Sequence, residues 1–164
     1  MSASVADVNS PAFHALLAQT GAAALVAVYF DQILAPATLQ RVPLGCYNVH
    51  PSLLPRHRGT SPVFWAMACG DTVAGVTLHR MAPAVDAGPI VAASATGLRP
   101  GDALSAVYLR CSRLAGVLLV RLADQLANGT APPARPQPGE GASFHSAPTR
   151  QAVRAFLARG YRLV

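Results

Sequence analysis

Asn48 and His50 lie two residues apart at the end of an apolar run, within the stretch GCYNVHPSLLPRHRG (residues 45–59). Residues two apart on a β-strand project from the same face, so both side chains are expected to point into one crevice. A side-chain amide can donate a hydrogen bond to a carbonyl oxygen, and an imidazole can stabilise developing negative charge or transfer a proton. The same spacing also fits a turn in which Asn48 bonds locally and backbone groups satisfy His50.

Asp86 is a third candidate, because it stands in the stretch VDAGPI among apolar neighbours. A carboxylate in such surroundings costs free energy unless a partner satisfies it. Pairing with His50 would orient the imidazole and favour its protonated form. The alternative is an Asx turn ahead of Gly88 and Pro89, in which the carboxylate bonds to its own backbone.

The remaining histidines give weaker signals. His79 ends the stretch GVTLH and is expected to be a core histidine or one that lies behind the catalytic groups. His57 is expected to face solvent in an arginine-rich loop. His14 is expected on an exposed helix face, and His145 lies in the C-terminal tail, so neither indicates a site.

The cysteines and the charged residues limit the chemistry further. Cys46, Cys69 and Cys111 lie far apart and lack metal-ligand spacing, so we expect buried free thiols and no metal site. All thirteen basic residues are Arg, which excludes a Schiff-base lysine and a phosphate-loop lysine. The net charge of +6 suits an anionic partner, although the scatter of the arginines weakens a nucleic-acid interpretation.

The size and composition of the chain indicate a single domain with a substantial core. It has 164 residues, of which 52% are hydrophobic and 12% charged, against about 25% charged in an average domain. No apolar stretch reaches the roughly 18 residues that a membrane-spanning helix needs, and the N-terminus lacks the pattern of a secretory signal. We therefore expect a cytoplasmic protein that does not contact membranes.

Helix and strand patterns alternate along the chain, which predicts an α/β fold with a mostly parallel, Rossmann-like sheet flanked by helices. The predicted strands are residues 23–30, 45–50, 74–81 and 88–98. The predicted helices are residues 11–20, 62–70, 102–128 and 149–160. The continuous apolar run of the first strand is typical of a strand that is buried on both faces. Ligands of such sheets bind beyond the carboxyl ends of the strands, where Asn48 and His50 are expected.

The stretch GCYNVHPSLLPRHRG, followed by GVTLH and DAGPI, resembles the 10-formyltetrahydrofolate-dependent formyltransferases. The three motifs occur in the order of that family, with Asp86 thirty-six residues after His50. The resemblance implies that Asn48, His50 and Asp86 form the catalytic trio. Asn48 and His50 would stabilise a tetrahedral oxyanion, and Asp86 would keep His50 charged and help to pass a proton from the amine to the folate.

The resemblance also implies a pocket for 10-formyltetrahydrofolate as the formyl donor, with no metal. The backbone around Ile33 and Leu34 and the loop that carries Val85 and Asp86 would hold the pterin. The turn that follows His50 would form another wall of this pocket. Its residues are Ser52, Leu53, Leu54 and Pro55.

The resemblance covers most of residues 8–140 and indicates an N-terminally truncated formyltransferase fold. Residues 1–130 are interpreted as the catalytic domain, and residues 131–164 as a Pro/Gly-rich extension with a short helix. The strand at 23–30 then lacks its outer neighbours, so we expect a second copy in a homodimer, another protein or the N-terminal segment to cover this edge.

Three functions remain open at this stage. The first is transfer of the formyl group to a small-molecule amine; tRNA is not expected as the acceptor, because no β-rich domain follows the catalytic one. The second is hydrolysis of the same donor, with water in place of the amine. The third is a degenerate module that binds folate or dimerises without activity.

Overall fold

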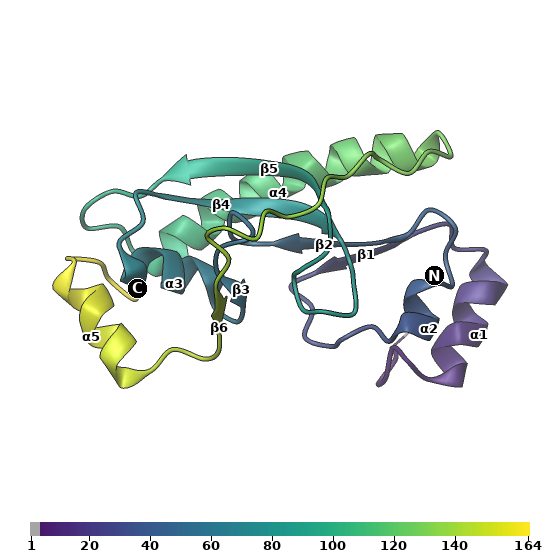
Figure 1. Cartoon of the computed structure of the whole chain (residues 1–164), viewed down its shortest axis with the longest axis horizontal. Coiled ribbons are helices and arrows are strands. Elements are labelled where there is room, and N and C mark those ends of the chain that lie inside the picture. Colours follow the sequence, from purple (N-terminus) through teal and green to yellow (C-terminus); the bar gives the residue numbers. More distant parts are fainter. Residues whose placement is uncertain (1–3) are drawn as a thin grey trace.

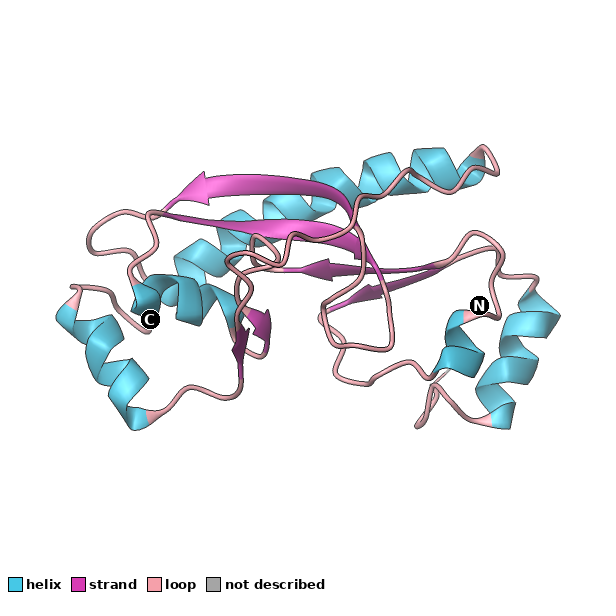
Figure 2. Ribbon diagram, viewed as in Figure 1, coloured by secondary structure: helices cyan, strands magenta, loops and turns pink. Residues whose placement is uncertain are grey.

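The computed structural model describes residues 4–164, in which helices flank a central sheet (Figure 1). In chain order the elements are α1 (Pro11–Thr20), β1 (Leu25–Val28), α2 (Pro36–Leu39), β2 (Cys46–His50), β3 (Arg58–Gly59), α3 (Pro62–Cys69), β4 (Val73–Arg80), β5 (Ile90–Gly97), α4 (Leu104–Ala127), β6 (Phe144–His145) and α5 (Arg150–Ala158). Helices α1 and α2 lie at one end of the molecule and α3 and α5 at the other, with the strands between them (Figure 2). The predicted α/β fold is confirmed.

The central sheet has four strands in the order β1-β2-β4-β5. Strand β1 pairs with β2 in parallel, whereas β2 with β4 and β4 with β5 are antiparallel pairs. The sheet is therefore mixed, and the prediction of a mostly parallel sheet is wrong. The loop 81–89 between β4 and β5 is too short for the crossover of about a dozen residues that parallel neighbours need.

The main core lies where α4 and α3 pack against β4 and β5. The apolar stripe of α4 is buried at Val107, Cys111, Leu118 and Leu122, and the predicted helix at residues 102–128 is confirmed. Burying each such leucine contributes about 1.5–3 kcal/mol to folding. In the described part of the chain, no helix combines the length and apolarity that crossing a bilayer requires.

A smaller core holds α1 and α2 against the start of β2. Ser10 caps α1 by accepting a hydrogen bond from the amide of Phe13, and Gly21 ends the helix in the left-handed conformation, so the predicted helix at residues 11–20 is confirmed. Asn9 then fixes the loop after β1, because its side chain donates to the carbonyl of Ile33 and accepts from the amide of Ala35. The N-terminal segment thus positions a loop that faces the cavity described below.

Strand β1 lies at the edge of the sheet, and within residues 4–164 no strand pairs with its outer side. Val26 and Val28 are exposed as a result, so the prediction of a strand that is buried on both faces is wrong. Residues 4–10 do not pair with this edge, because their hydrogen bonds to the rest of the chain beyond α1 reach residues 32–38. Residues 1–3 lie outside the part of the chain that the structure describes. The apolar run at 23–30 is typical of a buried strand, but β1 lies at the edge of the sheet and is partly exposed.

Residues 131–164 return across the sheet and join the main core (Figure 1). Strand β6 pairs in parallel with β3, and α5 packs against α3. Phe156 of α5 is fully buried and stacks on Phe64 of α3, with ring centroids 5.1 Å apart. The C-terminal segment therefore helps to hold the short β3 strand that follows the loop after β2.

Candidate active site

Asn48 and His50 project from β2 into one cavity of about 680 Å³, as their spacing predicts. Cavities of this size accommodate cofactor-sized ligands. His79 of β4 and Asp86 of the loop 81–89 line the same cavity. The antiparallel pairing of β2 with β4 places Asn48 directly opposite His79, so two neighbouring strands present polar groups at one point.

The carboxylate of Asp86 lies at the centre of this group. Its Oδ2 is 3.5 Å from Nδ1 of His50, and its Oδ1 is 3.4 Å from the amide nitrogen of Asn48. The backbone amide of Gly59 donates to Oδ2 at 2.9 Å. These partners are distant in sequence, which favours the paired interpretation of Asp86 over a local turn. The structure brings together all three residues that the sequence analysis singled out.

The hydrogen bonds of His50 indicate which of its two ring nitrogens carries a proton. Nε2 lies 2.8 Å from the carbonyl oxygen of His57, which can only accept, so Nε2 donates and carries a proton. Burial lowers the pKa of His50, and this outweighs the opposing effects of the Asp86 charge and the His57 carbonyl. The lowered pKa favours the neutral imidazole, with an unprotonated Nδ1 facing Asp86. That Asp86 would keep His50 charged stays a prediction, which the direction of this pKa does not favour.

The pKa of Asp86 is lowered, so its carboxylate stays ionised. Burial acts against this by raising the pKa, but the proximity of the His79 and His50 rings and the hydrogen bond from the amide of Gly59 together outweigh it. The backbone of Asp86 is also in the left-handed region, with φ at 50°, which is unusual for a residue other than glycine. The surrounding contacts thus hold an ionised carboxylate in a strained position beside a neutral imidazole.

His79 is buried and orients the amide of Asn48, in agreement with its predicted place behind the catalytic groups. Its Nδ1 donates to the carbonyl of Arg80 at 2.9 Å, which leaves Nε2 unprotonated in the neutral ring. That nitrogen accepts from the side-chain amide of Asn48 at 3.3 Å. The amide nitrogen of Asn48 is therefore held between His79 and Asp86.

Gln137 holds the loop that carries Asp86, and it was not among the predicted site residues. Its Nε2 donates to the carbonyl oxygens of Asp86 and Gly88 at 2.7 and 2.8 Å. Its Oε1 accepts from the guanidinium of Arg58. A Cβ at Gly88 would meet the carbonyl oxygen of Arg80 at 1.8 Å, so this close approach requires glycine. In the sequence, Gln137 ahead of a Gly-rich stretch is part of the resemblance to the formyltransferases, but that resemblance assigned it no role in the site.

Four of the residues assigned to the donor pocket line the cavity: Ile33, Leu34, Val85 and Asp86. Ile33 and Val85 are large apolar side chains that remain exposed, and the neighbouring aromatic rings of Tyr29 and Phe30 are exposed as well. Exposed apolar groups around a cavity are typical of a surface that binds a ligand.

The turn Ser52, Leu53, Leu54 and Pro55 does not line the cavity, so the expectation that it forms a wall of the pocket is corrected. It is anchored to the sheet instead. The hydroxyl of Thr77 on β4 donates to the carbonyl of Ser52 at 2.7 Å and accepts from the amide of Leu54 at 3.1 Å. These buried bonds fix the start of the loop whose later residues, His57 and Gly59, contact His50 and Asp86.

Comparison with known proteins places this geometry in a family. Residues 3–123 match the family model described as formyl transferase. Methionyl-tRNA formyltransferase from Mycobacterium avium is 40% identical over 136 residues, which cover 83% of this chain and 43% of that protein. The chain thus spans less than half the length of this curated relative.

Two solved structures are similar at 25% sequence identity. Glycinamide ribonucleotide transformylase 1 from Symbiobacterium toebii has a TM-score of 0.69, with 76% of this chain and 61% of that chain covered. The formyltransferase PseJ from Anoxybacillus kamchatkensis, solved with a UDP-linked formamido sugar and tetrahydrofolate, has a TM-score of 0.68, with 76% and 65% covered.

The sequence relatives contradict one prediction. A small-molecule amine was expected as the acceptor in place of tRNA, whereas curated relatives at 38–40% identity are methionyl-tRNA formyltransferases. The prediction rested on the lack of a further β-rich domain, a feature outside the part that these proteins share. The match over residues 3–123 and the identity to these relatives show that the chain belongs to the formyl transferase family.

Proposed function

We propose that this chain carries out formyl transfer from a 10-formyltetrahydrofolate donor to an amine, at the point where Asn48, His50 and Asp86 meet. The observation that carries the proposal is this convergence. Two side chains from β2 lie 3.4 and 3.5 Å from one carboxylate, at the wall of a cavity of about 680 Å³. The proposed catalytic groups belong to residues 1–130, and residues 131–164 contact and stabilise the loops around them.

The donor fits the apolar part of the cavity. A pterin is a flat ring that stacks on apolar side chains, and Ile33, Val85 and Phe30 offer such surfaces close to Asp86. Tetrahydrofolate in a solved formyltransferase of similar fold supports the same class of donor here. The formyl carbon would then lie in front of Asn48 and His50.

Attack by the amine forms a bond between its nitrogen and the formyl carbon, and the electron pair of the C=O bond moves to the oxygen. The amide of Asn48 donates to this oxyanion, replacing one of its bonds to His79 and Asp86. Because those two groups hold the amide in place beforehand, little reorganisation is needed when the charge develops. Loss of such a donor typically lowers the rate by about 10²–10³.

The amine must also lose a proton, and Nδ1 of His50 is the base that takes it. This nitrogen is unprotonated because burial lowers the pKa of His50 and Nε2 already carries the proton. The carboxylate of Asp86, 3.5 Å away, stabilises the imidazolium that forms. When the bond from the formyl carbon to the folate nitrogen breaks, that nitrogen takes the proton from His50 and leaves as tetrahydrofolate.

The sequence relatives support an aminoacyl-tRNA as the acceptor, with the amine of methionyl-tRNA as the first candidate. The net charge of +6 favours a polyanionic acceptor. Binding through phosphates weakens as salt rises, so the apparent affinity for tRNA should fall steeply with ionic strength.

One incubation tests the proposal. Purified protein is mixed with 10-formyltetrahydrofolate and methionyl-tRNA, methionine or no amine, and the release of tetrahydrofolate and the formylated product are followed. Release that requires methionyl-tRNA supports the proposal. Release without any amine would indicate a hydrolase, and binding of the donor without release would indicate an inactive folate-binding module.

A further inference from the structure

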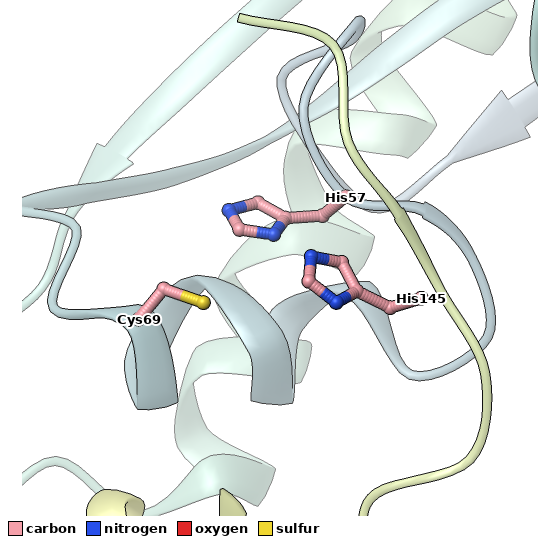
Figure 3. A group of neighbouring side chains, drawn as sticks. All are labelled: His57, Cys69 and His145. Carbon is pink, nitrogen blue, oxygen red and sulfur yellow. The ribbon is translucent and has the colours of Figure 1, made fainter.

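Three residues that are far apart in the sequence lie close together, and none of them lines the cavity of the active site (Figure 3). They are His57 in the loop after β2, Cys69 at the end of α3 and His145 in β6. One ligand atom from each lies within 4.8 Å of the other two. His57 is 4% exposed, although it was predicted to face solvent, and Cys69 is exposed, although it was predicted to be a buried thiol.

His57 presents an unpartnered nitrogen to this cluster. Its Nε2 donates to the carboxylate of Asp71 at 2.9 Å, so the neutral ring has its lone pair on Nδ1. Nδ1 is buried and makes no hydrogen bond. A carboxylate that accepts from one ring nitrogen while the other nitrogen is left free is the arrangement that orients metal-binding histidines.

His145 presents a second unpartnered nitrogen. Its Nε2 is buried without a hydrogen-bond partner. Its ring stacks on Trp65 at 4.4 Å and on His57 at 5.2 Å, which fixes its orientation. In the described residues, the two other buried side-chain nitrogens or oxygens without a partner are the Nε atoms of Arg80 and Arg110. Each of these side chains donates a hydrogen bond through another guanidinium nitrogen. Two of the four such atoms therefore face one small cluster.

We propose that His57 Nδ1, His145 Nε2 and Cys69 Sγ bind one divalent metal ion of the zinc class. Two imidazole nitrogens and one thiolate suit tetrahedral Zn²⁺, with water from the exposed side of Cys69 as the fourth ligand. Such a site needs ligand atoms about 3.4–3.6 Å apart, so the cluster contracts by on the order of 1 Å, chiefly by rotation of the Cys69 side chain. The Zn–S bond replaces the S–H bond, and the thiol proton is released to solvent.

The ion would link the loop after β2, which contacts the active site, to α3 and β6. The carbonyl of His57 accepts the hydrogen bond from His50, and Gly59, two residues later, donates to Asp86. Gly59 also pairs with His145 across the β3–β6 ladder. Metal binding would therefore stabilise the loop that positions His50 and Asp86. This coupling rests on the proposed function, whereas metal binding itself is measured without it.

The test uses the full-length chain after treatment with a chelator, titrated with Zn²⁺ and with Co²⁺ as a spectroscopic probe. The expected result is one ion per chain, visible Co²⁺ absorption of tetrahedral type and an ultraviolet band from thiolate to Co²⁺. Cys69→Ser should remove the thiolate band, and both Cys69→Ser and His145→Asn should weaken Zn²⁺ binding at least 100-fold. Asp71→Asn should weaken it about 10–100-fold, because it orients His57.

Cys111→Ala is the matched control, since this thiol is buried in the main core and is not one of the three proposed ligands. It should keep the metal stoichiometry and the thiolate band. Circular dichroism verifies that each variant is folded, and Cys69→Ser keeps the test informative if a histidine variant unfolds, because its side chain is exposed. Equal Zn²⁺ affinity in the wild type, Cys69→Ser and His145→Asn, or no binding to the folded wild type, would overturn the proposal. Loss of formyl transfer with the metal site intact would count only against the proposed function.

Discussion

Nε2 of His50 lies 2.8 Å from the backbone carbonyl oxygen of His57. This one bond fixes which ring nitrogen carries the proton, because a carbonyl oxygen only accepts. Nδ1 of His50 is then free to take a proton beside the Asp86 carboxylate, 3.5 Å away. A loop that is itself held by the C-terminal segment therefore sets the protonation of the residue proposed as the base.

Asn48→Ala should lower the rate of formyl transfer by about 10²–10³, because it removes the donor to the oxyanion. The fold should persist, since Asn48 is half-buried at the wall of an open cavity. Steady-state rates of tetrahydrofolate release, with circular dichroism as the control for folding, measure the effect. A variant with wild-type rate would show that another group stabilises the oxyanion.

The dependence of the rate on pH tests the protonation of His50. Its pKa lies below the ordinary value near 6.5, and the neutral form is the base, so kcat/KM should rise with pH through that lowered pKa and be level by pH 7. The buried histidines His57 and His79 act in the same direction as burial, whereas Asp86 opposes it. Asp86→Asn should therefore move the rise to lower pH and reduce the plateau. Activity that falls as pH increases past about 6.5 would instead indicate a reactive imidazolium.

Gln137→Ala should lower kcat on the order of 10²-fold with a smaller effect on KM for the donor. The substitution removes both bonds to the carbonyls of the Asp86 loop, and misplacing a catalytic group by about 1 Å has an effect of that size. Gln19→Ala, an exposed glutamine on α1, is the matched control. If both variants had the same kcat as the wild type, Gln137 would have no positioning role.

Ile33→Ser should weaken the binding of a folate analogue by about 10–100-fold, because burying such a side chain against a ligand contributes about 1.5–3 kcal/mol. Folding should be little affected, since the side chain is 61% exposed in the free protein. Val120→Ser on α4, at 62% exposure, is the matched control outside the cavity. Calorimetric titration measures both variants, and an unchanged dissociation constant for Ile33→Ser would place the pterin elsewhere.

The sequence predicts that Asn48, His50 and Asp86 meet at the wall of the cavity, for two reasons. Residues two apart on a strand project from the same face, so Asn48 and His50 lie on one face of β2. Strand geometry does not predict the position of Asp86, because its distance from His50 depends on a loop whose shape is set by Gly59, Gly88 and Gln137. The order of the three motifs connected Asp86 with Asn48 and His50, which the periodicity of hydrophobic residues could not do.

The features that sequence reasoning missed are set by tertiary contacts. An apolar run indicates burial but not whether a strand is central or at an edge, which is why the exposure of Val26 was missed. Alternating helices and strands favour parallel pairing, but the short connection from β4 to β5 gives a hairpin. His57 and His145 lie far apart in the chain, and only the β3–β6 pairing brings them together.

The most direct measurement is the single-turnover rate of formyl transfer from 10-formyltetrahydrofolate to methionyl-tRNA, for the wild type and for His50→Asn under identical conditions. We expect product that depends on methionyl-tRNA in the wild type, and a rate at least about 10² lower in His50→Asn with donor binding retained. Equal rates in the two proteins would contradict the assignment of His50 and Asp86 as the groups that move the proton.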